Sequence, residues 1–281
     1  MTNPIYPCLW FDGQAQAAAN LYCSIMKSSR IVAASPMVVN FELYGQKFMG
    51  LNGGPMYKIN PSISFFIRFD NEAELDNVWN PLAEGGEPLL PLNKYPWSEK
   101  YGWIKDRFGV TWQLMLDKSM PITQKIIPSL LFTEKSHGKG NAAIDFYTSL
   151  FPQSTINVRT NYLEGESNYA TTGMLKYSNF NLKGSAFTIM DAGFAQPYSF
   201  NEAISFVVEC EDQQEIDQYW NALSENGQEQ MCGWVKDQFG VCWQIVPKIL
   251  GQLMGDPAKG SRVIQAFLKM KKFDIQTLVD A

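Results

Sequence analysis

Apolar residues recur along this chain with two different spacings. The short apolar run Tyr6–Phe11 ends at an Asp-Gly pair, which is typical of a buried strand followed by a turn. Alanine, tyrosine and isoleucine then recur at helical spacing over Gln14–Lys27. Strand-like runs follow at Val38–Leu43, Lys47–Leu51 and Ile63–Phe69. The pattern therefore predicts a strand, a helix and then several strands.

A second helix and a hairpin complete this pattern. Asn71 can cap a helix with Glu74 three positions later, and Gly85 and Gly86 end its apolar stripe. The phrase Gly102–Gln113 has the composition of a β-hairpin with an Asp and Gly turn. In its outgoing strand, alternate side chains point to opposite faces. We therefore expect the tryptophan before Gln113 to pack on the helix and Gln113 to face the other way.

The phrase Gly102–Gln113 occurs twice. Its second copy is Gly233–Gln244, identical at nine of the twelve positions, and Ile63–Trp79 similarly matches Ile204–Trp220. A repeat of this length has the size of a small domain and exceeds that of a solenoid unit. We therefore expect a first module at 1–118, a second module at 126–247, and a helical C-terminal extension at 248–281. Within the extension, Asp256 followed by proline predicts a helix start, and a last short helix is expected from Asp274.

Composition excludes several classes of function. The 281 residues are 46% apolar and carry a net charge of −5, so no broad basic surface for nucleic acid is expected. No stretch of 18 apolar residues occurs, and the N-terminus lacks a basic segment followed by an apolar one. The five cysteines form no Cys-x-x-Cys pair, which is typical of reduced thiols. We expect a cytoplasmic protein without membrane or nucleic-acid partners. Whether it forms a homodimer stays an open question.

Three phrases carry a resemblance to a known family. They are the repeated hairpin, the segment Phe41–Pro55 and the segment Leu268–Ile275. Together they resemble the PhnB-like, or demethylubiquinone methyltransferase-like, branch of the vicinal-oxygen-chelate superfamily, which includes glyoxalase I, bleomycin-resistance proteins and extradiol dioxygenases. The resemblance implies an α+β fold of two tandem βαβββ modules, with paired curved sheets that enclose a cleft, plus C-terminal helices.

The same resemblance implies a divalent metal held by His, Glu or Gln side chains, but this chain departs from that pattern. The last-strand positions fall on Gln113 and Gln244, the first-strand positions near Tyr6 and Ile127, and the middle-strand positions near Ile63 and Ile204. Apolar side chains cannot ligate, and a lone amide oxygen is a weak ligand. We therefore expect no metal and no cofactor.

The methyltransferase label also lacks its expected motif. A Rossmann-type cofactor site needs a glycine-rich turn directly between a strand and a helix. The glycine-rich run Gly50–Pro55 is followed by Asn-Pro and a strand-like segment, so we interpret it as a turn or loop.

Apolar and aromatic side chains predict the ligand class. The segment Pro88–Tyr101 is longer than its counterpart in the second copy, and is either a lid over one side of a cleft or a shield for an apolar edge. We expect Gln113 and Gln244 to orient a ligand through their amides, unless neighbouring backbone groups use them. An apolar or flat small molecule suits this set. The predicted ligand-binding residues are Gln113, Gln244, Cys8, Trp10, Tyr95, Trp97 and Tyr101.

The sequence alone does not identify catalytic residues. Asp106 and Asp237 lie in the two hairpin turns, where an aspartate commonly bonds its own backbone, so we interpret both as structural. His137, the only histidine, lies between glycines in a segment that the first copy lacks, which favours a surface loop. The leading hypothesis is a metal-independent small-molecule-binding protein. The alternatives are a metal-dependent lyase, isomerase or dioxygenase, or a methyltransferase, and whether the chain is an enzyme stays open.

Overall fold

The computed structural model describes residues 4–119 and 124–281. Residues 1–3, and residues 120–123 between the two expected modules, lie outside the described residues. By packing, the chain divides into two compact units, one comprising Pro7–Ile204 and the other Pro4–Tyr6 with Ser205–Ala281.

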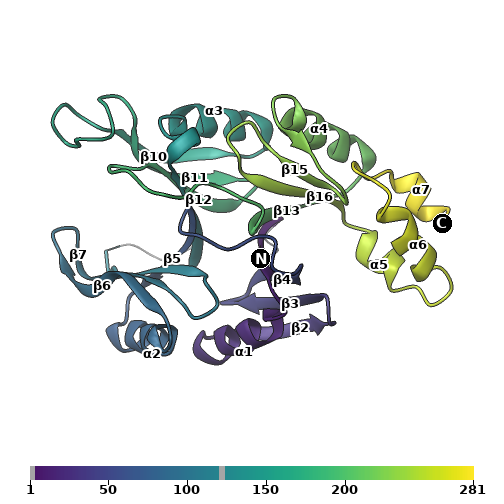
Figure 1. Ribbon diagram of the computed structural model, residues 1–281, viewed down its shortest axis with the longest axis horizontal. Coiled ribbons are helices and arrows are strands. Elements are labelled where there is room, and N and C mark those ends of the chain that lie inside the picture. Colours follow the sequence, from purple (N-terminus) through teal and green to yellow (C-terminus); the bar gives the residue numbers. More distant parts are fainter. Residues whose placement is uncertain (1–3, 120–123) are drawn as a thin grey trace. The chain divides into compact units, whose positions relative to one another are not determined.

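The order strand, helix and three strands occurs four times among the described residues, twice in each sequence repeat (Figure 1). In every βαβββ segment the first strand pairs in parallel with the last, and the third pairs antiparallel with the last. The first repeat comprises β1 (Ile5–Phe11), α1 (Ala15–Ile25), β2 (Arg30–Ala34), β3 (Val38–Leu43) and β4 (Gln46–Asn52), then β5 (Ile63–Phe69), α2 (Glu72–Ala83), β6 (Glu87–Tyr95), β7 (Ser98–Lys105) and β8 (Thr111–Leu116).

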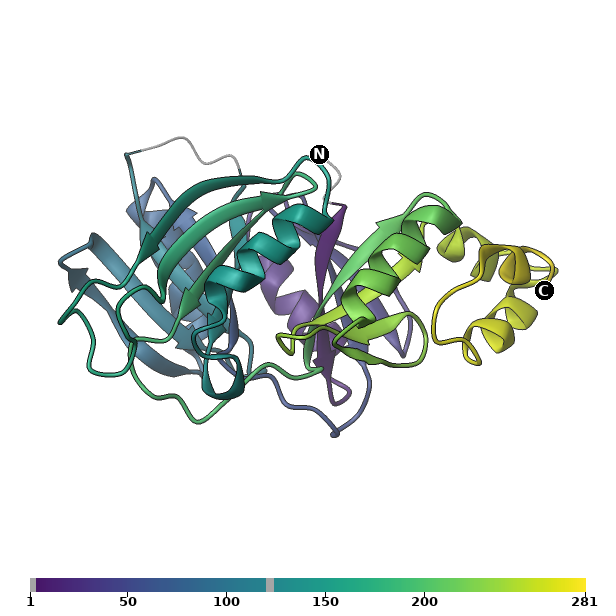
Figure 2. The ribbon, with the colours of Figure 1, turned by 90° about the horizontal axis from the view of Figure 1, so that it is seen from above.

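The second repeat has the same order. It comprises β9 (Ile126–Phe132), a short η1 turn (Glu134–Ser136), α3 (Gly140–Leu150), β10 (Thr155–Asn161), β11 (Leu175–Leu182) and β12 (Ser185–Asp191), then β13 (Ile204–Cys210), α4 (Gln213–Ser224), β14 (Gln228–Glu229), β15 (Trp234–Lys236) and β16 (Cys242–Pro247). Three helices follow in the second unit, where Figure 2 shows them in yellow: α5 (Leu250–Met254), α6 (Gly260–Phe267) and α7 (Ile275–Val279).

An eight-stranded sheet in the first unit combines halves of both repeats. Its strand order is β10-β11-β12-β9-β5-β8-β7-β6. The junction is the antiparallel pair β5 and β9, in which Ile63 stands opposite Leu130. Helix α2 packs on β5, β7 and β8, and α3 packs on β11 and β12. Figures 1 and 2 show both helices on the outer side of this curved sheet, and we call the opposite side its inner face.

Helix α2 shows why the sequence specifies these elements locally. The Asn71 side chain accepts a hydrogen bond from the backbone of Glu74, which caps the helix as expected. One stripe of the helix is almost wholly buried, and each such apolar side chain stabilises the fold by about 1.5–3 kcal/mol. The stripe consists of Leu75, Val78, Trp79 and Leu82. A side chain at Gly102 of β7 would lie 2.5 Å from the Trp79 ring, so glycine permits the close packing of helix and strand.

The two hairpin aspartates are structural, as expected. Asp106 is 3% exposed, and its Oδ1 accepts the backbone N–H groups of Phe108 and Val110 within its own turn. Its Oδ2 accepts the Trp112 indole N–H at 2.8 Å and the Tyr22 hydroxyl at 2.7 Å. Asp237 bonds its own turn and Trp243 in the same way. Carboxylates held by so many donors anchor the turn to the core.

Some expected elements differ from the structure. The expected loop Pro88–Tyr101 is a hairpin, with Tyr95 opposite Ser98 and Asn93 opposite Tyr101. No strand was expected at β2, whose side chains are mostly exposed and therefore carry little apolar signal. The expected helix start at Asp256 is wrong, because Asp256 bonds Ala258 in a turn and α6 begins at Gly260. The final helix is confirmed, and Asp274 caps it.

The expected α+β class, with two repeated modules and C-terminal helices, is confirmed. The boundaries 1–118, 126–247 and 248–281 stay a prediction, since the compact units follow strand pairing and not the repeat. Among the described residues, no helix is long and apolar enough to cross a membrane.

Candidate functional site

Gln113 lies on the inner face of the eight-stranded sheet. Its neighbour Trp112 is fully buried on the helix side, where its ring packs against Phe65. The Gln113 amide nitrogen donates to the Ser64 hydroxyl at 2.7 Å, and its oxygen accepts from the Tyr101 hydroxyl at 2.6 Å. The amide is therefore bonded to side chains and held in one orientation. Its expected ligand role stays a prediction.

Tyr101 connects Gln113 to an aromatic cluster on the β6–β7 hairpin. Tyr95 and Trp97 stack with ring centroids 5.1 Å apart, and both meet the Tyr101 ring edge-on at about 6 Å. Burial raises the pKa of the Tyr101 hydroxyl, so this group stays protonated and donates to Gln113. The Trp97 side chain is 60% exposed. Four of the seven predicted residues thus lie together, and the hairpin offers a ring surface beside a fixed amide.

Two buried donors on the same face were not found from the sequence. Trp103 stands opposite Gln113 in β7, and Arg68 stands opposite Met115 in β5. The Trp103 Nε1 and Arg68 Nε atoms are buried, and neither has a hydrogen-bond partner among the described residues. Strand alternation provides a signal for Trp103, because Gly102 faces α2 and its neighbour must face inward.

Arg68 forms an ion pair through one end of its guanidinium. Its Nη2 group donates to Oδ2 of Asp117 at 2.6 Å, and both side chains are about one-fifth exposed. The other Asp117 oxygen accepts from the backbone and hydroxyl of Ser119. The ion pair therefore uses one end of the guanidinium and leaves Nε without an acceptor.

The other three predicted residues lie elsewhere. Cys8 is 1% exposed within β1, opposite Met49 of β4. The Trp10 indole donates to the Gly54 carbonyl at 2.7 Å. Gln244 donates to Ser205 at 2.9 Å in the second unit, which repeats the pair of Gln113 with Ser64. None of the five cysteines, all of which lie within the described residues, forms a disulfide bond.

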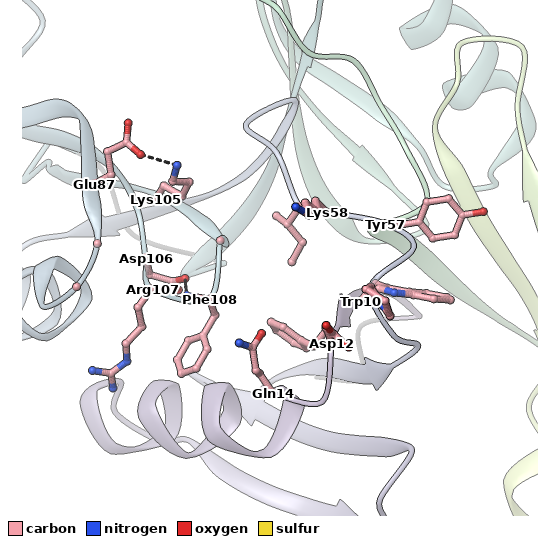
Figure 3. Close-up of a pocket in the computed structure, with 16 residues that line it drawn as sticks. Trp10, Asp12, Gln14, Tyr57, Lys58, Glu87, Lys105, Asp106, Arg107 and Phe108 are labelled. Atoms are coloured by element: carbon pink, nitrogen blue, oxygen red, sulfur yellow. Dashed lines mark hydrogen bonds and ion pairs between the residues drawn. The ribbon is translucent and has the colours of Figure 1, made fainter.

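Trp10 lines a pocket of about 530 Å³ in the first unit (Figure 3). Trp10 and Tyr57 lie at one end of the pocket in this view, and Arg107 and Phe108 at the other. Its buried carboxylate, Asp106, already has four donors, and its remaining charged groups are exposed or paired. The pocket has a suitable volume for a ligand, but no buried polar group in it lacks a partner among the described residues.

His137 bonds a main-chain carbonyl. Its Nε2 atom lies 2.9 Å from the Ala192 oxygen, and its ring lies 4.3 Å from that of Tyr169. The half-buried ring thus ties the segment before α3 to the end of β12.

Comparisons with known proteins agree with this architecture. The family model described as 3-demethylubiquinone-9 3-methyltransferase matches the chain twice, over residues 3–115 and 124–246. The chain belongs to this family. It is therefore a tandemly duplicated, PhnB-like member of the vicinal-oxygen-chelate superfamily, as its sequence motifs predict.

Solved structures resemble the chain at two levels of sequence identity. The PhnB protein from Bacillus cereus is 35% identical over 39% of this chain and 96% of that protein, with a TM-score of 0.37. A glyoxalase I variant from Zea mays is 10% identical over 86% of this chain and 91% of that one, with a TM-score of 0.56. The maize enzyme therefore shows a shared fold. No curated protein matches the chain.

The residues of this family member do not fit the metal that the superfamily implies. The amide oxygen and nitrogen of Gln113 are both hydrogen-bonded to hydroxyl groups. Its neighbour on β5 is Phe66, and the residue opposite Phe66 on β9 is Ile127, so both neighbouring positions are apolar. Within residues 4–119 and 124–281, no three His, Cys, Asp or Glu side chains gather as a metal site. The middle-strand position was expected near Ile63, and the adjacent Ser64 is the residue there that contacts Gln113.

Proposed function

We propose that this PhnB-like protein binds a small apolar or aromatic molecule on the inner face of its eight-stranded sheet, without a metal. The observation that carries the proposal is the pair of buried donors at Trp103 and Arg68. A buried donor without an acceptor costs about 1–3 kcal/mol, so such groups normally have a partner. An acceptor on a bound molecule would supply it.

The neighbouring groups suit such a ligand. The aromatic cluster of Tyr95, Trp97 and Tyr101 supplies a flat apolar surface, and Gln113 fixes the orientation of polar groups beside it. Since both donor atoms are shielded from solvent, ligand entry requires the covering side chains to move. Within the aromatic cluster, Trp97 at the hairpin tip has the most exposed side chain.

We expect the natively purified protein to retain a small organic molecule and no stoichiometric metal. Native mass spectrometry and elemental analysis of one preparation measure both properties. Stoichiometric zinc, iron, manganese or nickel would support the metal-dependent enzyme alternative and contradict the metal-free proposal. Saturable binding of S-adenosylmethionine by calorimetry would favour the methyl transfer that the family's name describes. The absence of any bound molecule together with no aromatic ligand in a thermal-shift screen would contradict the binding function itself.

Replacing Gln113 with leucine is expected to weaken ligand binding by about 1–3 kcal/mol, because a buried hydrogen-bonding group is lost. The matched control is Gln244→Leu in the second unit, where Cys232 stands in place of Tyr101 and the short β14–β15 hairpin has no counterpart of Tyr95 and Trp97. We expect the control to bind normally. Calorimetric titration of both variants with the retained molecule measures the difference, and equal affinities for the two would place the ligand elsewhere.

A further inference from the structure

The two donors that lack partners share one chemical property. Both are N–H groups with no accepting capacity, so the ligand atoms that meet them must be acceptors. A hydroxyl or amine could serve only through a lone pair and would bring an additional proton that needs its own acceptor. Carbonyl and carboxylate oxygens have no such proton. The ligand's polar end is therefore of the acceptor type.

The charge on Arg68 decides between a carbonyl and a carboxylate. Its guanidinium is always protonated, and Asp117 contacts only its Nη2 end. Asp117 in turn divides its two oxygens between Arg68 and Ser119. A carboxylate meeting the buried Nε–H forms a charge-assisted hydrogen bond, which is shorter and stronger than a bond to a neutral carbonyl. Tyr177 also lies within electrostatic range of Arg68. Burial raises the pKa of the Tyr177 hydroxyl, and the positive charge of Arg68 opposes this rise.

We infer that the inner face recognises an aromatic carboxylate, whose anionic group meets Arg68 and Trp103 while its ring lies toward the Tyr95, Trp97 and Tyr101 cluster. This inference rests on the proposed binding function and names its ligand class. Arg68 and Trp103 set specificity for the anion, and the hairpin binds the ring without regard to charge.

The test compares 1-naphthoate with 1-naphthalenemethanol, a neutral molecule with the same rings. Isothermal titration calorimetry with the full chain is expected to show naphthoate binding about tenfold more tightly, a preference of about 1.4 kcal/mol. Arg68→Lys keeps the positive charge but removes the Nε–H, and Trp103→Phe keeps a ring but removes the indole N–H. Each variant should lose most of the preference for naphthoate over the alcohol.

Two further controls separate the possible outcomes. Lys58→Met alters the rim of the pocket that contains Trp10 and should leave both affinities unchanged. Urea unfolding of every variant distinguishes a local loss of binding from a loss of fold. Equal binding of the two naphthalenes, weakened alike by Gln113→Leu, would overturn the carboxylate inference and leave the binding function standing. Binding of neither compound would overturn both.

Discussion

Replacing Asp106 with alanine is expected to destabilise the first unit by about 3–5 kcal/mol, because several buried donors lose their acceptor at once. The carboxylate accepts from the Tyr22 hydroxyl, the Trp112 indole and two backbone groups of its own turn. These bonds join α1 to the β7–β8 turn and to β8. Urea unfolding followed by tryptophan fluorescence measures the loss.

Two further variants serve as controls for Asp106→Ala. Tyr22→Phe removes only one of the four donors and should cost about 1–2 kcal/mol. Asp12→Ala removes an exposed carboxylate of the same unit and should change stability by less than about 0.5 kcal/mol. If Asp106→Ala were no more harmful than Asp12→Ala, the turn carboxylate would not be a structural anchor. Asp106 would then be available for a chemical role.

Short-range features of the fold could be predicted from the sequence. The Asn71 cap, the buried stripe of α2 and the β7–β8 turn depend on residues close together in the chain. The repeated phrase adds an internal check, since both copies place an aspartate, a glycine and a tryptophan at equivalent positions of a hairpin. Local propensity and periodicity are sufficient for such elements.

The pairing of strands from different repeats could not be predicted in this way. Strand β5 of the first repeat pairs with β9 of the second, so the eight-stranded sheet spans the module boundary. Each repeat has the same apolar pattern whichever neighbour its edge strand pairs with. The choice depends on long-range contacts that leave no periodic signal in the sequence.

The candidate site was only partly predictable for a related reason. Strand alternation correctly places Gln113 opposite the helix-packed Trp112, and the aromatic hairpin lies beside it through Tyr101. The same reasoning did not find Arg68, because a charged residue in a strand usually indicates solvent. Only the structure shows that its Nε is buried and lacks a partner among the described residues. Cys8 and Trp10 were grouped with Gln113 by residue type alone, and the fold separates them.

Replacing Gly86 with alanine is expected to cost about 3 kcal/mol of stability, since it forces a methyl group into the backbone where α2 meets β7. The added carbon would lie 2.5 Å from the Leu82 carbonyl oxygen and 2.8 Å from that of Lys105, and backbone atoms cannot swing aside as a flexible side chain can. Gly227 in the second repeat has the same contacts, at 2.6 Å from Leu223 and 2.2 Å from Lys236, so Gly227→Ala should behave alike.

The adjacent Gly85 provides the control for this prediction. It has a positive φ of 71° but its nearest contact is 3.5 Å away, so Gly85→Ala carries only the conformational strain of about 1–2 kcal/mol. Because β7 also carries Tyr101 and Trp103, a shift of this strand in Gly86→Ala should weaken naphthoate binding as well as stability, whereas Gly85→Ala should bind normally. Urea unfolding and calorimetry on the two variants measure both effects. Equal stability of Gly86→Ala and Gly85→Ala would show that the backbone between α2 and β7 accommodates the methyl group at little cost in stability. This contact would then not position the inner face.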